Sequence, residues 1–136
     1  MFEIVWTTRE QMWEATQKCF QDIQGIDEVI NLQNRVFKYP SNDICFGDAQ
    51  IDGLEYPPTH DRLTVYIAYS IEEKTVHYVF DFFEPEIHYF DIEFNTHWID
   101  EITIQRNTDN KYSISFGSGE CCFRYSHAQV NRCWID

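Results

Sequence analysis

A strict alternation of apolar and other residues is the feature that most limits the folds open to this chain. In the segment 63–71 every second residue is large and apolar, and the same period returns after the turn 72–74. This period is that of a half-buried β-strand. Further short segments of strand character follow, separated by turns; they are 76–82, 87–94, 101–106, 111–116, 120–125 and 129–134. Consecutive short strands predict an antiparallel β-meander that forms a rolled or sandwich-like sheet.

The N-terminal part of the chain has a different period and predicts a helix over about 8–24. Thr8 can cap this helix, and Gln11 follows at the spacing of a capping box. Apolar or small residues recur at helical intervals on one face, namely Met12, Trp13, Thr16, Phe20 and Ile23. Gly25 is a suitable end for the helix. A second short helical or irregular piece is expected over 26–34.

The segment of about 35–61 contains prolines and glycines that mark turns, and we expect it to be irregular apart from a short strand at 49–54. The length of 136 residues suits one domain. We therefore predict a single α+β domain over 1–136, in which the N-terminal helix packs against a β-meander of about 63–135.

The sequence also bears on location. The first ten residues lack the basic and apolar regions of a signal peptide, and no apolar run approaches the roughly 20 residues of a membrane span. The five cysteines are Cys19, Cys45, Cys121, Cys122 and Cys133. Their odd number and the absence of an export signal predict a cytoplasmic protein with free thiols.

The formal net charge of −13 is large for this length. It repels nucleic acid phosphates and anionic membrane surfaces, so we expect direct binding to neither. It favours a basic protein partner, or serves solubility alone. The oligomeric state is not predicted.

No sequence motif indicates catalysis. Cys121, Cys122, Cys133 and His127 lie close in sequence, but adjacent cysteines on a strand face opposite sides and cannot converge on one zinc ion. Two pairs of neighbouring carboxylates, Glu84 and Glu86 on either side of a proline and Asp91 and Glu93 on one strand face, are more simply explained by a solvated face. We therefore expect no enzymatic activity, no metal and no cofactor.

Two windows of the chain, 39–61 and 75–105, contain no Lys or Arg but many carboxylates. If the windows meet in space, they form one acidic surface, interspersed with aromatic side chains from Tyr66, Tyr78, Tyr89 and Trp98. Aromatic anchors among carboxylates suit capture of a basic protein, because the rings supply contact area and the charges speed encounter. The predicted partner-binding residues are Glu84, Glu86, Tyr89, Asp91, Glu93, Trp98, Asp48, Asp52 and Glu55.

The order of three segments resembles the immunity protein fifty family of bacterial polymorphic toxin systems. The segments are FGDAQI at 46–51, FDIEFNTHWIDEITIQ at 90–105 and KYSISFGSGECCFRYSHAQV at 111–130. Phe94 and Asn95 match a phenylalanine–asparagine strand end in that family. Gly119, Cys121 and Phe123 match its glycine turn and its late strand of F-x-C-like character.

The resemblance covers roughly 46–133. It implies a small, β-rich, cytosolic protein without enzymatic activity, which blocks a cognate toxin by occluding it. The negative charge, an independent observation, would suit a basic toxin such as a nuclease. Three alternatives stay open: an inhibitor of the phage counter-defence type that mimics nucleic acid, an enzyme or metal protein of unrecognised type, and a structural domain of unknown role.

Overall fold

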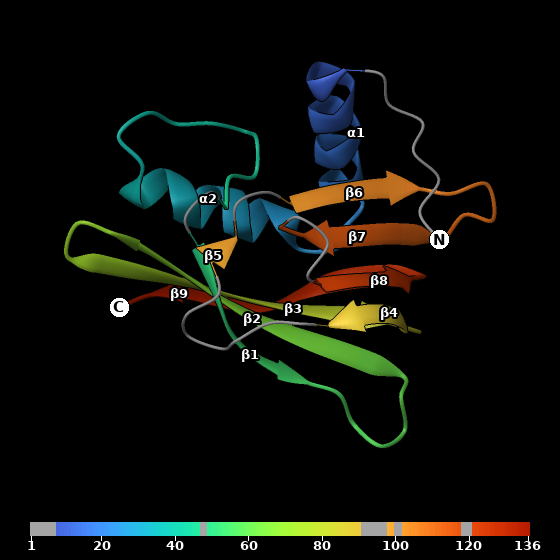
Figure 1. Cartoon of the computed structure of the whole chain (residues 1–136). Coiled ribbons are helices and arrows are strands. Elements are labelled where there is room, and N and C mark those ends of the chain that lie inside the picture. The colour runs from blue at the N-terminus through green and yellow to red at the C-terminus, as the bar shows by residue number, and fades with distance from the viewer. Residues whose placement is uncertain (1–7, 47–48, 91–97, 100–101, 118–120) are drawn as a thin grey trace.

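The computed structural model describes residues 8–46, 49–90, 98–99, 102–117 and 121–136, and it has the predicted α+β architecture (Figure 1). The helices are α1 (Arg9–Gln21) and α2 (Ile26–Val36). The strands are β1 (Ala49–Glu55), β2 (Arg62–Ile71), β3 (Lys74–Phe83), β4 (Glu86–Phe90), β5 (Trp98–Ile99), β6 (Ile102–Arg106), β7 (Tyr112–Phe116), β8 (Cys121–Tyr125) and β9 (His127–Ile135). All strand pairs are antiparallel, and the N-terminal helix packs on a sheet, as predicted.

Helix α1 begins as the sequence predicts but buries a slightly different face. The side chain of Thr8 accepts a hydrogen bond from the backbone N–H of Gln11 at 3.1 Å. The buried side chains of the helix include Cys19 and Phe20, whereas Trp13 is 45% exposed. The predicted face was therefore wrong at Trp13. The Trp13 indole N–H instead donates to Asp43 at 3.2 Å, in the loop that follows α2.

Helix α2 starts directly after Gly25, which has a φ of 84°. This left-handed conformation is costly for any residue with a Cβ atom. A Cβ at Gly25 would also lie 3.4 Å from the Cβ of Val130 in β9. The positive φ, and not the distance to β9, is therefore the reason that this turn between the helices requires glycine.

We expect Gly25→Ala to lower the free energy of unfolding by about 1 kcal/mol, because alanine must adopt the left-handed conformation. Urea unfolding followed by circular dichroism measures the change. Gly53→Ala is the matched control, since Gly53 has no positive φ and an added Cβ would meet only a Tyr66 ring atom at 3.8 Å. Equal losses in both variants would contradict the conformational argument.

The strands form two sheets. Sheet A has the order β5-β1-β2-β3-β9, and sheet B has the order β4-β8-β7-β6. The meander prediction describes β1-β2-β3 and β6-β7-β8, in which sequence neighbours pair. It does not describe the pairs β3–β9 and β4–β8, which join segments far apart in the sequence.

The two sheets are joined by one bent pair of strands. Phe83 pairs with His127 in sheet A and Glu86 pairs with Arg124 in sheet B, so the same register runs through the junction. The bend falls at Glu84, whose φ of 53° is left-handed, and at Ser126, whose N–H donates to the Phe83 carbonyl at 3.0 Å. The turn predicted between the strands 120–125 and 129–134 is thus a change of sheet without reversal of the chain, the usual way to make a corner in a folded sheet.

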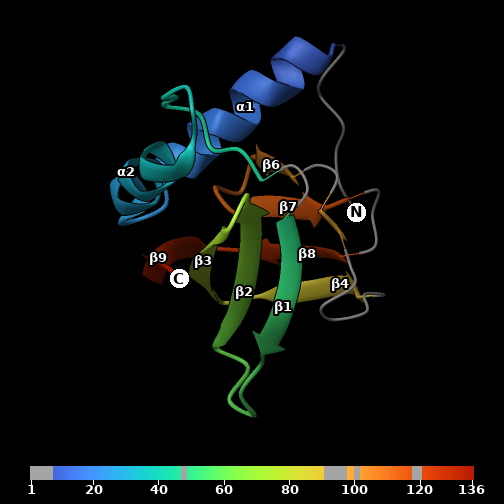
Figure 2. The same cartoon turned by 90° about the vertical axis from the view of Figure 1, so that its left-hand side faces the viewer.

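The hydrophobic core lies between the two sheets and under the helices. Phe82 of β3 contacts Phe123 and Tyr125 of β8, with ring centroids 5.0 and 4.9 Å apart. Helix α1 packs on β6, where the Thr16 hydroxyl accepts a hydrogen bond from the Ile104 N–H at 3.2 Å. Helix α2 packs on β9 and β3. Figure 2 shows both helices together on one side of the sheets. None of the helices in the described part of the chain has the length and apolar character needed to cross a membrane.

Candidate protein-binding surface

The side-chain positions of four predicted binding residues are not described. Asp48, Asp91 and Glu93 lie outside the described residues, and of Trp98 only the backbone, within β5, is described. The remaining five fall into two groups. Asp52 and Glu55 belong to β1 in sheet A, whereas Glu84, Glu86 and Tyr89 lie at the start of sheet B or along its edge strand β4.

Glu86 is locally neutralised. Its carboxylate oxygens lie 3.2 Å from Lys111 Nζ and 3.2 Å from Arg124 Nη1, and Arg124 also pairs with Asp109. The hydrogen bond from Arg124 and the contact with the Lys111 N–H lower the pKa of Asp109. The absence of Lys and Arg from the window 75–105 therefore does not leave Glu86 unpaired, because its cations come from β8 and from the residue just before β7.

The two windows without basic residues meet where β1 pairs with β5, and they meet again at the corner between the sheets. The Glu84 N–H donates to the Asp61 carbonyl at 3.0 Å, and both side chains are exposed. The Glu84 carboxylate accepts a hydrogen bond from Ser126 at 2.7 Å, and Asp61 accepts one from Thr59 at 2.6 Å. The hydrogen bond from Thr59 lowers the pKa of Asp61. These two carboxylates therefore lie close together on the surface at the corner.

A groove of about 400 Å³ crosses the outer face of sheet A, on the side away from the core. We call it the sheet-A groove, and its lining includes Asp52, Glu55, Tyr66, His77, Val79 and Trp134. Register places these side chains on one face, because Tyr66 is opposite Val79 and His77 is opposite Trp134. The groove therefore draws on β1, β2, β3 and β9.

The β1 side of the groove is shaped by a bulge. The register with β2 shifts between Ile51 and Gly53, so Asp52 is the extra residue. Gly53 follows and has no side chain to fill the space beside the Tyr66 ring. Glu55, at the exposed end of the strand, accepts a hydrogen bond from the Tyr66 hydroxyl. This bond raises the pKa of Tyr66, and the positive charge of Arg132 acts against the rise.

The opposite side of the groove is aromatic. The imidazole of His77 stacks on the indole of Trp134, with centroids 4.6 Å apart, and its Nε2 lies 2.7 Å from an Asp136 carboxylate oxygen. The guanidinium carbon of Arg132 lies over the Trp134 ring at 5.0 Å. No ion pair found among the described residues involves Asp52 or Glu55. The groove therefore combines two carboxylates that form no ion pair among the described residues with the half-buried rings of Tyr66 and Trp134.

Asp81 lies on the same face of sheet A but is 1% exposed. Its carboxylate accepts hydrogen bonds from Thr64 at 2.6 Å and from Gln129 and Asn131 at 3.0 Å each. Burial by itself would raise the pKa of Asp81, but these three hydrogen bonds outweigh it and hold the pKa below its ordinary value. Asp81 thus belongs to a buried polar network and is not available to a partner.

Sequence reasoning identified only part of this surface. It named Asp52, Glu55 and Tyr66 but missed His77, Val79 and Trp134. It also placed Tyr78 on the acidic surface, which is wrong, because Tyr78 is buried and packs against Phe46 with ring centroids 5.1 Å apart. The available signal was the alternation in β3: if Tyr78 faces the core, its neighbours His77 and Val79 must face outward.

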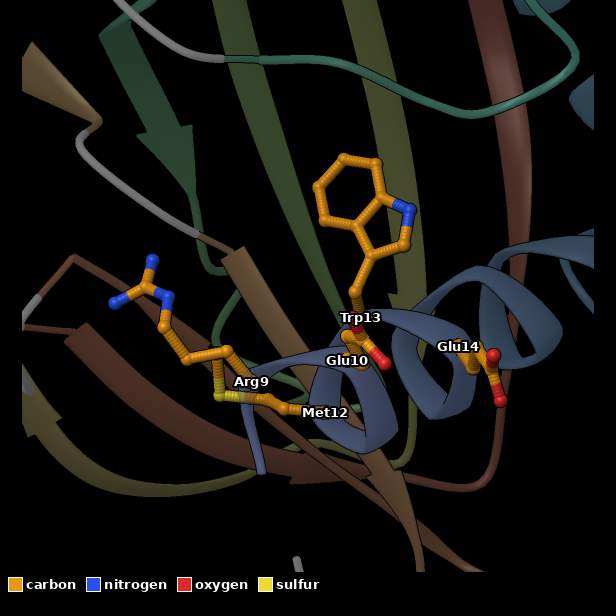
Figure 3. A pocket seen from close by; sticks show the side chains of 5 residues that line it. All are labelled: Arg9, Glu10, Met12, Trp13 and Glu14. Atoms are coloured by element: carbon orange, nitrogen blue, oxygen red, sulfur yellow. The ribbon is translucent and has the colours of Figure 1, made fainter.

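A second hollow, of about 300 Å³, lies on the outer side of α1, and the described residues that line it are Arg9, Glu10, Met12, Trp13 and Glu14 (Figure 3). It is on the helical side of the molecule (Figure 1). No three His, Cys, Asp or Glu side chains in the described ranges form a group that could hold a metal ion. The described cysteine sulfurs, those of Cys19, Cys45, Cys122 and Cys133, are free thiols.

Comparisons of the chain with protein families, with characterised proteins and with solved structures gave no match. The fold and the surface themselves define a small α+β protein with an open, partly aromatic and acidic groove on one sheet.

Proposed function

We propose that this chain is an acidic cytoplasmic immunity protein of a bacterial toxin system, which binds and occludes a basic toxin. The observation that best supports the proposal is the sheet-A groove, where Asp52 and Glu55 border the half-buried rings of Tyr66 and Trp134. The net charge of −13 and the resemblance of 46–133 to the immunity protein family point in the same direction.

The physical basis is electrostatic capture followed by contact. Opposite charges accelerate the encounter of two proteins, and aromatic side chains then supply contact area of low entropic cost. The exposed carboxylates of Glu84 and Asp61 extend the negative surface to the sheet corner, and Tyr89, 52% exposed, adds an aromatic ring on β4. These residues make up the proposed interface together with the groove.

The described carboxylates favour this proposal over a mimic of nucleic acid. A mimic needs rows of unpaired negative charges that imitate phosphates. Here Glu86 and Asp109 share Arg124, and Asp81 is buried. Competition distinguishes the two functions: an oligonucleotide displaces a mimic from its target, whereas it need not displace an inhibitor that binds away from the nucleic acid channel.

The proposed function is tested with the polypeptide encoded beside this chain. The two proteins are co-expressed, and growth and complex formation are measured. We expect the chain to restore growth and to form a stoichiometric complex that weakens as salt is raised. If the neighbouring polypeptide is not basic, is not retained at low salt and is not neutralised, the proposal is wrong.

Charge removal in the groove gives a sharper prediction. The double variant Asp52→Asn/Glu55→Gln should associate with the toxin about three- to tenfold more slowly at low salt, because two steering charges are lost. Stopped-flow or surface plasmon resonance measures the rate. Glu10→Gln/Glu14→Gln on α1 changes the net charge equally and should have the smaller effect. Equal slowing by both variants would indicate that only the total charge matters.

A further inference from the structure

We infer that the sheet-A groove is a subsite for an arginine side chain of the partner, an inference that rests on the proposed function. The guanidinium would stack on the rings of Tyr66 and Trp134, and the carboxylates of Asp52 and Glu55 would balance its charge. These groups come from three different strands but line one groove of about 400 Å³.

The walls and floor of the groove match the parts of an arginine side chain. Val79 lies at the bottom of the groove and is 2% exposed, so the methylene groups would pack mainly along the half-buried Tyr66 ring. The bulge at Asp52 and the missing side chain at Gly53 keep the β1 wall open beside the Tyr66 ring. Arginine fits better than lysine, because a planar and weakly hydrated guanidinium stacks on aromatic rings.

The molecule already contains a guanidinium in this type of contact. Arg132 has its guanidinium carbon 5.0 Å from the centre of the Trp134 ring. The Trp134 ring is therefore presented so that a guanidinium can lie over it. Arg132 also repels an incoming cation and covers part of the ring that the cation needs. We therefore expect Arg132 to compete with the partner's arginine, and its removal should strengthen binding.

The test uses a short peptide, acetyl-Gly-Arg-Gly-amide, and NMR titration of the complete chain. Binding is expected to be weak and to shift the Trp134 indole N–H and the Val79 methyl signals. The matched probe carries citrulline, which has nearly the same shape as arginine but no charge. The citrulline peptide should bind at least about fivefold more weakly, since both charge balance and cation–π attraction are lost.

Two variants of the groove should change the affinity for the arginine peptide in opposite directions. Asp52→Asn/Glu55→Gln should weaken binding of the arginine peptide about three- to tenfold. Arg132→Gln should strengthen it about two- to fivefold, because a competing cation is removed. The dispersion of each variant's NMR spectrum reports whether it is folded.

The inference is overturned if the citrulline peptide binds as well as the arginine peptide, if the shifts fall away from the groove, or if Arg132→Gln binds no better than the parent chain. These outcomes leave the proposed function intact if the toxin is still neutralised, because the peptide titration contains no toxin. Conversely, if the neighbouring polypeptide is not bound but the arginine peptide is, the subsite stands and the proposed function fails.

Discussion

Replacing Phe82 by alanine should lower the free energy of unfolding by about 3–5 kcal/mol, the largest effect we expect from a single core substitution. Phe82 is 2% exposed, and its ring contacts Phe123 and Tyr125 across the two sheets. The substitution removes apolar surface and leaves a cavity where the sheets meet. Because the surrounding rings belong to strands fixed in both sheets, they can close the cavity only in part.

The neighbouring residue is a suitable control for this experiment. Phe83 is on the opposite face of β3, where it is half-buried and stacks on His127 with centroids 4.6 Å apart. Phe83→Ala should cost only about 1 kcal/mol. Urea unfolding of both variants measures the difference. If Phe82→Ala costs as little as Phe83→Ala, the core does not lie between the sheets as described.

Removing the carboxylate of Asp81 is the second change of large expected effect. Asp81→Val keeps a residue suited to a strand but leaves the donors of Thr64, Gln129 and Asn131 without their acceptor. We expect a loss of about 2–4 kcal/mol in the free energy of unfolding. Asp81→Asn retains one acceptor oxygen and should cost about 1–2 kcal/mol, and Thr64→Val, which removes a single bond, about 1 kcal/mol.

The pH dependence of stability provides an independent readout of Asp81. Its folded pKa lies below the ordinary value of 3.8, so the folded protein binds fewer protons than the unfolded chain. The stabilisation is therefore fully present above that value and is lost as the pH falls through the folded pKa. Between pH 5 and about pH 3, stability should decline less steeply in Asp81→Asn than in the parent chain. Parallel declines would show that the Asp81 network does not depend on its charge.

The secondary structure was largely readable from the sequence because its causes are local. Alternation identified β2 and β3, and Thr8 with Gln11 identified the start of α1. The two-residue strand β5 has no pattern that could reveal it. The corner at Glu84 and Ser126 was also hidden: a bend and a reversing turn both interrupt alternation, and only pairing between distant segments tells them apart.

The candidate site was less predictable, because its charge balance depends on partners far apart in the sequence. A window without Lys or Arg appears unpaired, yet register places Glu86 opposite Arg124. The polar environment that buries Asp81 depends likewise on the pairing of β3 with β9. By contrast, the contact between Glu84 and Asp61 follows from chain connectivity, because both residues lie directly beyond the last pair of the β2–β3 hairpin.

The bent strand pair has a consequence for how the protein unfolds. Two continuous chains, β3 into β4 and β8 into β9, contribute hydrogen bonds to both sheets at once. Neither sheet can peel from the other without breaking the ladder that runs through Glu84 and Ser126. The protein should therefore unfold as one cooperative unit. A partner bound to sheet A would also stabilise sheet B, because the same two continuous chain segments form part of both sheets.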